Sequence, residues 1–256
     1  MTANALDLYT NEMPSHRVAF SLFEGTWASS VPGYGLGSAL LFEDPRIDWL
    51  LEQCGGVAGK SVVELGPLEG GHTYMMANAG AESITSIEAN SNAFLKCLLV
   101  QNALKFKADF LYGDFRPYLD ECERRFDFLL ASGVLYHMTD PIKVIESMAN
   151  VSDSLGIWTH YYDASAPGYK ERQKPYCEEA PTITTFRGKT MTTHKRHYEA
   201  DLDSKNFLGG SAPYSRWMTK DTLIAALEAM DMKVTIGTDH PDHPNGPCVL
   251  LFATRV

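Results

Sequence analysis

Three acidic residues of this sequence stand at, or just after, the ends of successive apolar segments. Glu64, Glu88 and Asp114 each belong to a run with the composition of a buried strand, one strand–helix unit apart. Because the carboxyl ends of parallel strands meet at one edge of a sheet, we expect the three carboxylates to converge there. Glu88 is placed to accept hydrogen bonds from the two hydroxyls of a ribose. Asp114 is placed to accept from an adenine amino group, with Phe115 covering the ring.

The turn after the first of these segments is rich in glycine. Gly66, Gly70 and Gly71 follow Glu64 and precede a segment with helical character. Glycine lets the backbone approach a ligand without a Cβ clash. Such a turn between a strand and a helix suits a nucleoside-bearing cofactor. It is shared by nicotinamide-binding folds, and Glu88 fits the ribose of NAD equally well.

Together these residues resemble the class I S-adenosylmethionine-dependent methyltransferases over about residues 58–162. The first motif of that family runs acidic-x-Gly-x-Gly-x-Gly, and here Leu68 takes the place of the middle glycine, next to Pro67. The Gly113-Asp-Phe115 element favours this family over the nicotinamide-binding folds. The resemblance implies S-adenosylmethionine as cofactor and S-adenosylhomocysteine as product. It implies the following cofactor contacts: Glu64 near the methionine ammonium, Gly66 and Gly70 in the turn, Glu88 on the ribose, Asp114 and Phe115 at the adenine, and Ser132 at the end of the fourth strand.

Strand-like and helix-like segments alternate along most of the chain from residue 61. We expect strands over 61–65, 83–88, 110–112, 126–132, 155–162, 233–236 and 249–254, and helices over 73–79, 92–106, 117–124, 141–150 and 223–230. Thr219 is expected to be the N-cap of the last helix. Strands that alternate with helices form a parallel sheet covered on both faces. The predicted fold class is therefore α/β, with a Rossmann-like, doubly wound, seven-stranded, mostly parallel sheet. The last two strands fit the antiparallel finish of the resembled family.

Two segments lie outside this alternation. Residues 1–57 are expected to form an N-terminal cap on a methyltransferase domain of residues 58–256, with a flexible loop at 33–38 and a helix that starts at Asp44-Pro45. Residues about 163–215 are rich in Pro, Gly, Tyr, His and charge. A long irregular segment inside a compact domain is typical of a functional loop, and we expect an inserted substrate lid there.

The run from Ser132 to His137 follows the fourth strand, whose end faces the transferred methyl group in the resembled family. Its part from Gly133 to His137 is also similar to a run in the carboxymethyl-transferring tRNA wobble-uridine enzymes, which use a carboxylated donor. His137 is a candidate catalytic base, because histidine titrates near neutral pH, or else it braces the loop. His160 and Tyr162 end the fifth strand, where one of them points into the substrate cavity or anchors the lid.

Aromatic and basic side chains are expected around this pocket. Trp27 and Tyr34 of the cap either wall the substrate pocket or form a dimer contact, and Trp217 packs either on substrate or on the core. His194 and His197 lie near a group of basic lid residues that would attract an anionic substrate. Those seven residues are Lys170, Arg172, Lys174, Arg187, Lys189, Lys195 and Arg196.

The overall composition argues against several classes of protein. The chain has 256 residues, a formal net charge of −10 and 45% hydrophobic residues, as in a globular enzyme. This charge argues against unselective binding to nucleic acid or anionic membrane, and no apolar run is long enough for a membrane span. The five cysteines are scattered, so we expect reduced thiols and a cytoplasmic location. His240 and His243, with Asp239 and Asp242, lie in a Pro-rich segment, and we expect no metal site.

These observations favour a methyltransferase that acts on an O, N or C atom of a small, neutral or anionic molecule in specialised metabolism. Two alternatives stay open. One is a tRNA wobble-uridine modification enzyme, and the other is a non-catalytic regulator that binds S-adenosylmethionine. The expected partners are a small-molecule substrate and a second copy in a homodimer, rather than nucleic acid or membrane.

Overall fold

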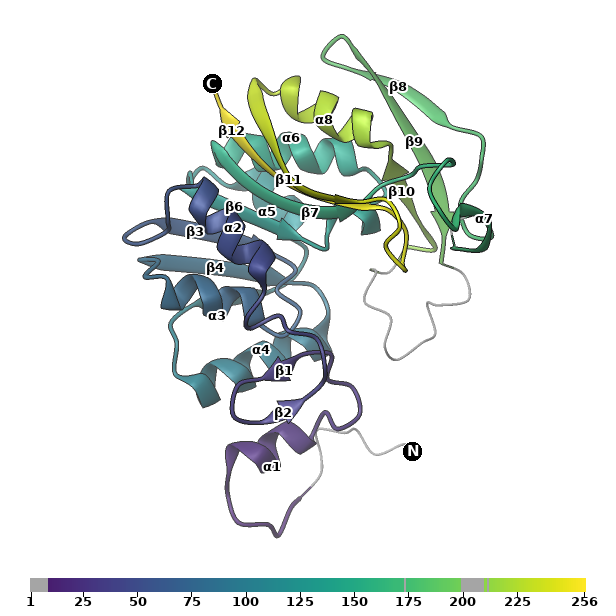
Figure 1. Ribbon diagram of the computed structural model, residues 1–256. Helices are drawn as coiled ribbons and strands as arrows, with labels where there is room; N and C mark the ends of the chain where they lie inside the picture. Colours follow the sequence, from purple (N-terminus) through teal and green to yellow (C-terminus); the bar gives the residue numbers. More distant parts are fainter. Residues whose placement is uncertain (1–8, 173, 199–209, 211) are drawn as a thin grey trace.

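A seven-stranded sheet forms the centre of the molecule (Figure 1). The computed structural model describes residues 9–172, 174–198, 210 and 212–256. The strand order is β11-β12-β7-β6-β3-β4-β5; β12 runs antiparallel to both neighbours and the other pairs are parallel. The strands are β3 (Ser61–Leu65), β4 (Ser83–Glu88), β5 (Asp109–Tyr112), β6 (Phe128–Ser132), β7 (Ser154–His160), β11 (Met232–His240) and β12 (Cys248–Arg255). This confirms the predicted fold class.

Helices cover both faces of the sheet (Figure 1). They are α2 (Pro45–Gln53), α3 (Gly71–Asn78), α4 (Ser91–Leu104), α5 (Phe115–Glu121), α6 (Pro141–Val151) and α8 (Lys220–Glu228). On one face, Leu50 of α2 and Met76 of α3 belong to the same buried cluster as Val62 and Phe128 of the sheet. Within the described residues, no helix is both long and apolar enough to cross a membrane.

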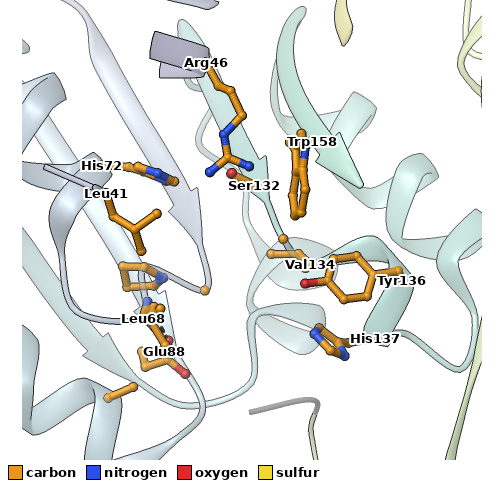
Figure 2. Close-up of a pocket in the computed structure, with 14 residues that line it drawn as sticks. Leu41, Arg46, Leu68, His72, Glu88, Ser132, Val134, Tyr136, His137 and Trp158 are labelled. Atoms are coloured by element: carbon orange, nitrogen blue, oxygen red, sulfur yellow. Dashed lines mark hydrogen bonds between the residues drawn. The ribbon is translucent and has the colours of Figure 1, made fainter. Parts of the chain in front are cut away.

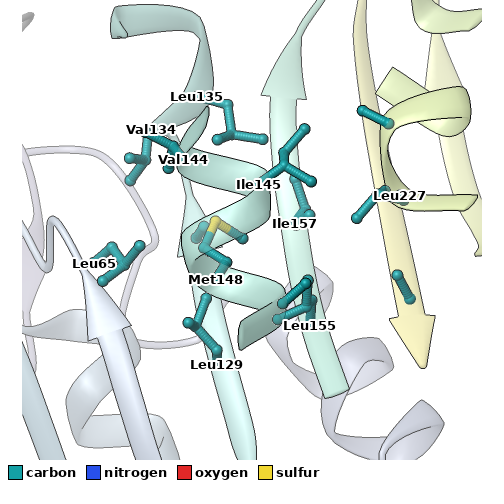
Figure 3. Close-up of a cluster of buried hydrophobic side chains, with 14 of the residues drawn as sticks. Leu65, Leu129, Val134, Leu135, Val144, Ile145, Met148, Leu155, Ile157 and Leu227 are labelled. Carbon is teal, nitrogen blue, oxygen red and sulfur yellow. The ribbon is translucent and has the colours of Figure 1, made fainter. Parts of the chain in front are cut away.

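The larger core lies on the opposite face, under α5, α6 and α8. Ile145 and Met148 of α6 pack with Leu129 of β6 and Ile157 of β7, and Leu227 of α8 extends the same cluster (Figure 3). Each of these side chains is almost fully buried. Burial of one such side chain contributes about 1.5–3 kcal/mol, so this layer holds the central strands, and with them their carboxyl ends, in place.

Side-chain caps fix where several helices begin. Asp44 accepts from the Arg46 amide and Thr219 from the Thr222 amide, as expected for helices that start there. Each cap satisfies an N–H group that the first turn leaves without an intrahelical partner. Asp114 caps α5 in the same way, so this helix begins at Phe115 and not at the predicted residue 117.

The N-terminal cap contains a helix and a hairpin. α1 (His16–Ser21) precedes β1 (Ser30–Val31) and β2 (Gly35–Leu36), which pair antiparallel. The expected flexible loop at 33–38 is therefore corrected: it includes the turn and second strand of a hairpin, and Gly33 and Gly35 supply the positive φ angles of 78° and 74° that so tight a turn needs.

A buried ion pair joins α4 to the glycine turn after β3, and its carboxylate also holds the cap. Lys96 Nζ lies 2.9 Å from Glu69 Oε1. The two carboxylate oxygens of Glu69 also accept from the backbone amides of Ala28 and Ser29, at 3.0 and 2.7 Å. The side chains of Glu69 and Lys96 are almost fully buried, so the cap and the turn are held together by charge as well as by apolar packing.

The expected lid is more regular than its sequence indicates. It contains α7 (Tyr169–Arg172), β8 (Thr182–Phe186) and β9 (Lys189–His197), and β10 (Tyr214–Met218) completes a three-stranded antiparallel sheet in the order β10-β9-β8. In Figure 1 this sheet projects beyond the end of α8. The part of the predicted lid at 199–209 lies outside the described residues, as do residues 1–8 of the cap.

Candidate functional site

A cavity of about 270 Å³ lies at the carboxyl edge of the parallel strands (Figure 2). Leu68 and Glu88 face Tyr136 and His137 across it, and Arg46 enters from the start of α2. Its wall comprises Leu41, Arg46, Gly66, Pro67, Leu68, His72, Glu88, Ala93, Ser132, Gly133, Val134, Tyr136, His137 and Trp158. This is the edge where open α/β sheets bind ligands. Of the predicted site residues, the structure brings Gly66, Glu88, Ser132 and His137 together here.

Glu88 connects the end of β4 to the turn after β3. Its Oε2 accepts from the Leu68 amide at 3.1 Å and its Oε1 from the Asn90 amide at 2.8 Å. Burial raises the pKa of Glu88, and these two hydrogen bonds oppose that shift. The carboxylate is thus fixed in the cavity wall before any ligand arrives.

Leu68, at the position of the expected middle glycine, adopts a backbone conformation that favours glycine. Its φ of 57° is left-handed, as are the φ angles of 64° at Gly66 and 78° at Gly70. A left-handed conformation is costly for a residue with a branched side chain. The bond from the Leu68 amide to Glu88 helps to hold it. Gly70 itself lies outside the cavity wall, where a Cβ atom would come within 3.3 Å of Phe110.

Glu64 lies beneath the cavity, and its expected place near a methionine ammonium stays a prediction. It is 1% exposed and accepts from the hydroxyls of Thr73 and Ser86. Burial raises the pKa of its carboxyl group. The side chain that reaches the cavity at this point is His72, whose Nε2 is 3.0 Å from Asp44 Oδ2.

Asp114 and Phe115 lie at the expected strand end but outside the cavity wall. Asp114 caps α5 and its Oδ2 lies 2.5 Å from Arg116 Nη2. Hydrogen bonding from Arg116 lowers the pKa of this carboxyl group. Phe115 is buried in the main core. Contact of these residues with an adenine ring stays a prediction.

His137 is held by the lid through a chain of hydrogen bonds. Its Nδ1 lies 3.1 Å from the hydroxyl of Tyr198, which donates to the Tyr136 carbonyl at 3.2 Å and accepts from the Ser215 hydroxyl at 2.9 Å. The donor in this contact depends on the tautomer of His137. We assign the proton of the neutral ring to Nδ1, which leaves the lone pair on Nε2. Burial lowers the pKa of His137 to about 3, so the ring is neutral at physiological pH.

His160 does not line the cavity, which corrects its expected position. Its Nδ1 lies 2.9 Å from the Gly246 carbonyl and 3.1 Å from the Pro247 carbonyl. The residue of β7 that reaches the cavity is Trp158, two positions earlier on the same face. Burial lowers the pKa of His160 to about 4.

Tyr162 and Trp217 are part of the packing between lid and core. Trp217 is 2% exposed and its ring stacks on His160 at 5.4 Å. Tyr162 stacks on His194 at 3.4 Å, and its hydroxyl is 2.8 Å from that of Tyr169. The sequence left two roles open for Trp217, and its buried position fits packing on the core. Tyr162, which packs on His194 and Tyr169 of the lid segment, fits the role of lid anchor.

Trp27 and Tyr34 also lie away from the cavity. Both pack edge-to-face on Phe20 of α1, with ring centroids 5.3 and 4.7 Å apart. Lys96 Nζ lies 5.0 Å from the Trp27 ring centroid. These partly buried aromatics therefore pack within the cap, outside the cavity wall, and their expected substrate or dimer contact stays a prediction.

Arg46 and Tyr136 are cavity residues that sequence reasoning did not select. The Arg46 guanidinium lies 4.5 Å from the Trp158 ring centroid and pairs with Asp44 at 2.5 Å. Burial opposes ionisation of Asp44, but hydrogen bonds from His72 and Arg46 outweigh it and hold the pKa of that carboxyl well below its usual range. The sequence contains no local signal for Arg46, because the dipole of a helix disfavours a cation in its first turn.

The basic residues of the lid are largely neutralised by acids. Lys174 pairs with Glu179 and Lys195 with Glu178. Arg187 pairs with Glu146 of α6, 3.4 Å away. Lys189 of β9 likewise pairs with Glu228 of α8 at 2.8 Å. The lid cations therefore fasten the lid to itself and to the domain.

Among the lid residues that the structure describes, two further basic positions contact aromatic rings or an acid. Arg196 lies against the rings of Tyr176 and Trp217, at 5.0 and 4.8 Å from their centroids. His197 Nε2 is 3.0 Å from Glu178 Oε1. Lys170 is exposed on α7, and the side chain of Arg172 lies outside the described residues.

Solved structures that match this chain carry the same arrangement of sheet and helices. The N-terminal domain of EvdMO1 with SAH (S-adenosylhomocysteine) bound matches with a TM-score of 0.65 at 21% identity, and the match covers 88% of both chains. Magnesium protoporphyrin IX methyltransferase (ChlM) from Synechocystis PCC 6803 with bound SAH matches with a TM-score of 0.57 at 15% identity, over 94% of this chain and 100% of that one. The fold is that of the class I S-adenosylmethionine-dependent methyltransferases. This confirms the predicted family resemblance at the level of the fold.

Two further matches are to proteins whose descriptions name a sugar or a tRNA. The EvdMO1 domain was also solved in the presence of SAH and D-fucose, and that structure matches with a TM-score of 0.63 at 20% identity over 87% of this chain and 86% of that one. A tRNA U34 carboxymethyltransferase of Campylobacter concisus is 24% identical over 188 residues, which cover 70% of this chain and 64% of that protein. The chain thus spans less than two thirds of the length of this curated relative. No protein-family model matches the chain.

Proposed function

We propose that this chain is an S-adenosylmethionine-dependent methyltransferase that acts on a small molecule. The observation that carries the proposal is the cavity at the sheet edge, where Gly66, Glu88 and His137 meet in a methyltransferase fold. Bound S-adenosylmethionine supplies a methyl group on a positively charged sulfur. The bond from the nucleophile to the methyl carbon forms while the carbon–sulfur bond breaks, and the sulfur takes the electron pair.

The residues around the cavity fit this cofactor. Glu88 offers a fixed carboxylate for hydroxyl groups, and the backbone at Gly66 and Gly133, with φ of 64° and 87°, lets a ligand approach closely. A Cβ atom at Gly66 would lie 3.3 Å from Val134 in the cavity wall. We therefore propose that Glu88, the 66–68 turn and the Ser132–Gly133 strand end hold the cofactor.

His137 is the proposed proton acceptor for the nucleophile. Its Nε2 keeps a lone pair because Nδ1 donates to Tyr198. Its low pKa makes it a weak base, but displacement at a sulfonium depends on alignment more than on base strength. The ring thus orients a hydroxyl or amine of the substrate and removes its proton as the new bond forms. Because it is neutral, it does not place a second positive charge beside the sulfonium.

Three observations favour a small molecule over RNA. The cavity holds about 270 Å³, the chain carries a net charge of −10, and lid cations such as Lys174, Arg187 and Lys189 are paired with acids. A nucleic-acid surface needs cations that remain available for phosphates. The EvdMO1 domain was solved in the presence of D-fucose, and this favours an oxygen nucleophile on a hydroxylated compound.

The five cysteines are free, which supports a cytoplasmic location for this chemistry.

Modification of tRNA is the second candidate, favoured by the sequence match to the tRNA U34 carboxymethyltransferase. It requires a tRNA-binding surface that extends beyond the cavity. A salt-dependent complex with bulk tRNA, weakened strongly between 50 and 200 mM salt as is typical of phosphate contacts, would support this candidate.

The proposal is tested by incubating the chain with methyl-labelled S-adenosylmethionine and, separately, with a small-molecule extract or bulk tRNA. Label in the small-molecule fraction supports the proposed function, and label in tRNA supports the second candidate. His137→Gln serves as the active-site variant, and the matched control is the exposed histidine variant His240→Gln. If the chain binds the cofactor and labels neither fraction, the catalytic proposal is wrong and a regulator that only binds the cofactor is favoured.

A further inference from the structure

Two histidines and a cysteine that the proposed methyl transfer does not use lie together behind the cavity wall. One side-chain donor atom from each of His160, His243 and Cys248 lies within 4.8 Å of the other two. We propose that these three residues form a binding site for one zinc ion. Two nitrogen donors and one sulfur donor are the ligand types that zinc prefers, whereas magnesium and calcium prefer oxygen.

The backbone places two of the three ligands opposite one another. His160 at the end of β7 and Cys248 at the start of β12 are directly paired residues of antiparallel strands. They are 5% and 1% exposed. His243 comes from the loop that joins β11 to β12, and its ring centroid lies 5.3 Å from that of His160. The loop therefore closes over a strand pair that is already fixed.

The orientation of His160 is that of a metal ligand. Its Nδ1 donates to the carbonyls of Gly246 and Pro247, so Nε2 carries the lone pair and is the atom available to a metal. Zinc-bound histidines characteristically donate their other ring N–H to a carbonyl or carboxylate in this way. Stacking on Trp217, with an angle of 7° between the ring planes, fixes the rotation of the ring as well.

The remaining ligand reaches the site with a small adjustment. His243 is half-buried, and its Nδ1 accepts from the Asn245 amide at 3.2 Å. Zinc bonds of about 2.0–2.1 Å to nitrogen and 2.3 Å to sulfur place tetrahedral ligands roughly 3.4–3.6 Å apart. The donor atoms therefore need to close by about 1 Å, and the loop that carries His243 is the part able to move. Three protein ligands leave a fourth position for water.

Zinc at this place would fasten the β11–β12 loop to β7 behind the substrate side of the cavity. The ring centroid of Trp158, a wall residue, lies 5.0 Å from that of His160, and the ring centroid of Tyr136 lies 4.7 Å from it. The cluster shares only His243 with the group His240, His243, Asp239 and Asp242, for which the sequence predicted no metal site. In the structure, Asp239 instead accepts from Tyr161 and pairs with Lys220.

The proposal is tested with the full chain after chelator treatment and removal of the chelator. Zinc is titrated in competition with a metal-sensitive dye, and cobalt is titrated separately. We expect one equivalent of zinc per chain and, with cobalt, the charge-transfer absorption of a thiolate bond. His243→Ala removes a ligand from a half-buried loop position and should weaken zinc binding at least about tenfold. Cys248→Ser should abolish the cobalt–thiolate absorption.

Matched controls use the same residue types outside the cluster. His240→Ala, at an exposed neighbouring position, and Cys177→Ser, at a second buried cysteine, should bind zinc like the parent chain. The site does not exist if the parent chain binds zinc no more tightly than His243→Ala, or if the cobalt–thiolate absorption survives in Cys248→Ser. Where Cys248→Ser does not fold, the comparison of His243→Ala with His240→Ala decides.

Discussion

The Nδ1 atom of His137 in the cavity wall lies 3.1 Å from the hydroxyl of Tyr198 in the lid segment. This contact makes the lid part of the active-site support, because it fixes which ring nitrogen carries the proton. The same hydroxyl also donates to the Tyr136 carbonyl and accepts from Ser215. The lid thus acts on the chemistry through a hydrogen bond.

Replacement of Tyr198 by Phe should lower kcat about 10- to 100-fold and leave the Kd for S-adenosylmethionine unchanged. The variant removes the group that orients His137 but leaves the cofactor contacts intact. Steady-state kinetics and calorimetry on the same preparation measure both. The Tyr198→Phe/His137→Gln double variant should be no slower than His137→Gln, since the two act as a unit. Additive losses would show that Tyr198 acts elsewhere.

Replacement of Glu88 by Gln should raise the Kd for S-adenosylmethionine at least about tenfold. A hydrogen bond to a charged group contributes about 1.5–3 kcal/mol, and the neutral amide lacks the charge. Calorimetric titration measures the change. The control is Glu123→Gln, an exposed position after α5. Equal affinity in the two variants would place the cofactor away from Glu88.

Replacement of Glu69 by Ala should lower the free energy of unfolding by about 3–5 kcal/mol. It leaves Lys96 buried without its anion and removes the acceptor of the Ala28 and Ser29 amides. Urea unfolding followed by fluorescence measures the loss. The exposed pair of Lys189 and Glu228 provides the control, because Glu228→Ala should have little effect. A small loss for Glu69→Ala would mean that water reaches Lys96.

Stability should fall as the pH falls below about 6.5. Burial lowers the pKa of His137 to about 3 and that of His160 to about 4, from 6.5 in the unfolded chain. Between these values the unfolded chain binds more protons than the folded one, so each histidine contributes a slope of about 1.4 kcal/mol per pH unit. The stabilisation that the two neutral histidines contribute is fully present above pH 6.5 and is lost progressively towards pH 4.

The matching measurement is urea unfolding at pH 7.0, 6.0 and 5.0 for the parent chain and His160→Gln. The slope of the unfolding free energy against pH differs between the two proteins only by the contribution of His160, because both contain the buried carboxyls Glu64 and Glu88. The variant should show the shallower slope. Identical slopes would mean that folding does not lower the pKa of His160.

The sequence was sufficient where a local rule determines the structure. Asp44 and Thr219 were readable as helix caps, and Glu88 was readable as a strand-end carboxylate, because capping and strand termination depend on neighbours in sequence. The cavity side of β7 was harder. The alternation of side chains placed His160 on the correct face of β7. It could not show which residue of that face lies at the cavity, and in the structure this residue is Trp158.

The lid strands could not be predicted from their alternation alone. β8 is Thr-rich and mostly exposed on both faces, so it lacks the apolar–polar pattern of a core strand. The sequence did contain a turn signal, because Gly188 follows Arg187 between the two strands. In the structure both residues have positive φ angles, 47° and 81°. This is the geometry of a two-residue hairpin turn. The buried position of Trp217 depends on its contact with His160, which is distant in sequence and which the sequence alone does not reveal.

Calorimetric titration of the parent chain with S-adenosylmethionine, S-adenosylhomocysteine and NAD tests the central claim most directly. The account predicts one binding site for each of the two adenosyl compounds, weakened in Glu88→Gln, and no heat of binding with NAD. Binding of NAD with no binding of either adenosyl compound would contradict it, because the cavity at Glu88 would then hold a dinucleotide rather than a methyl donor.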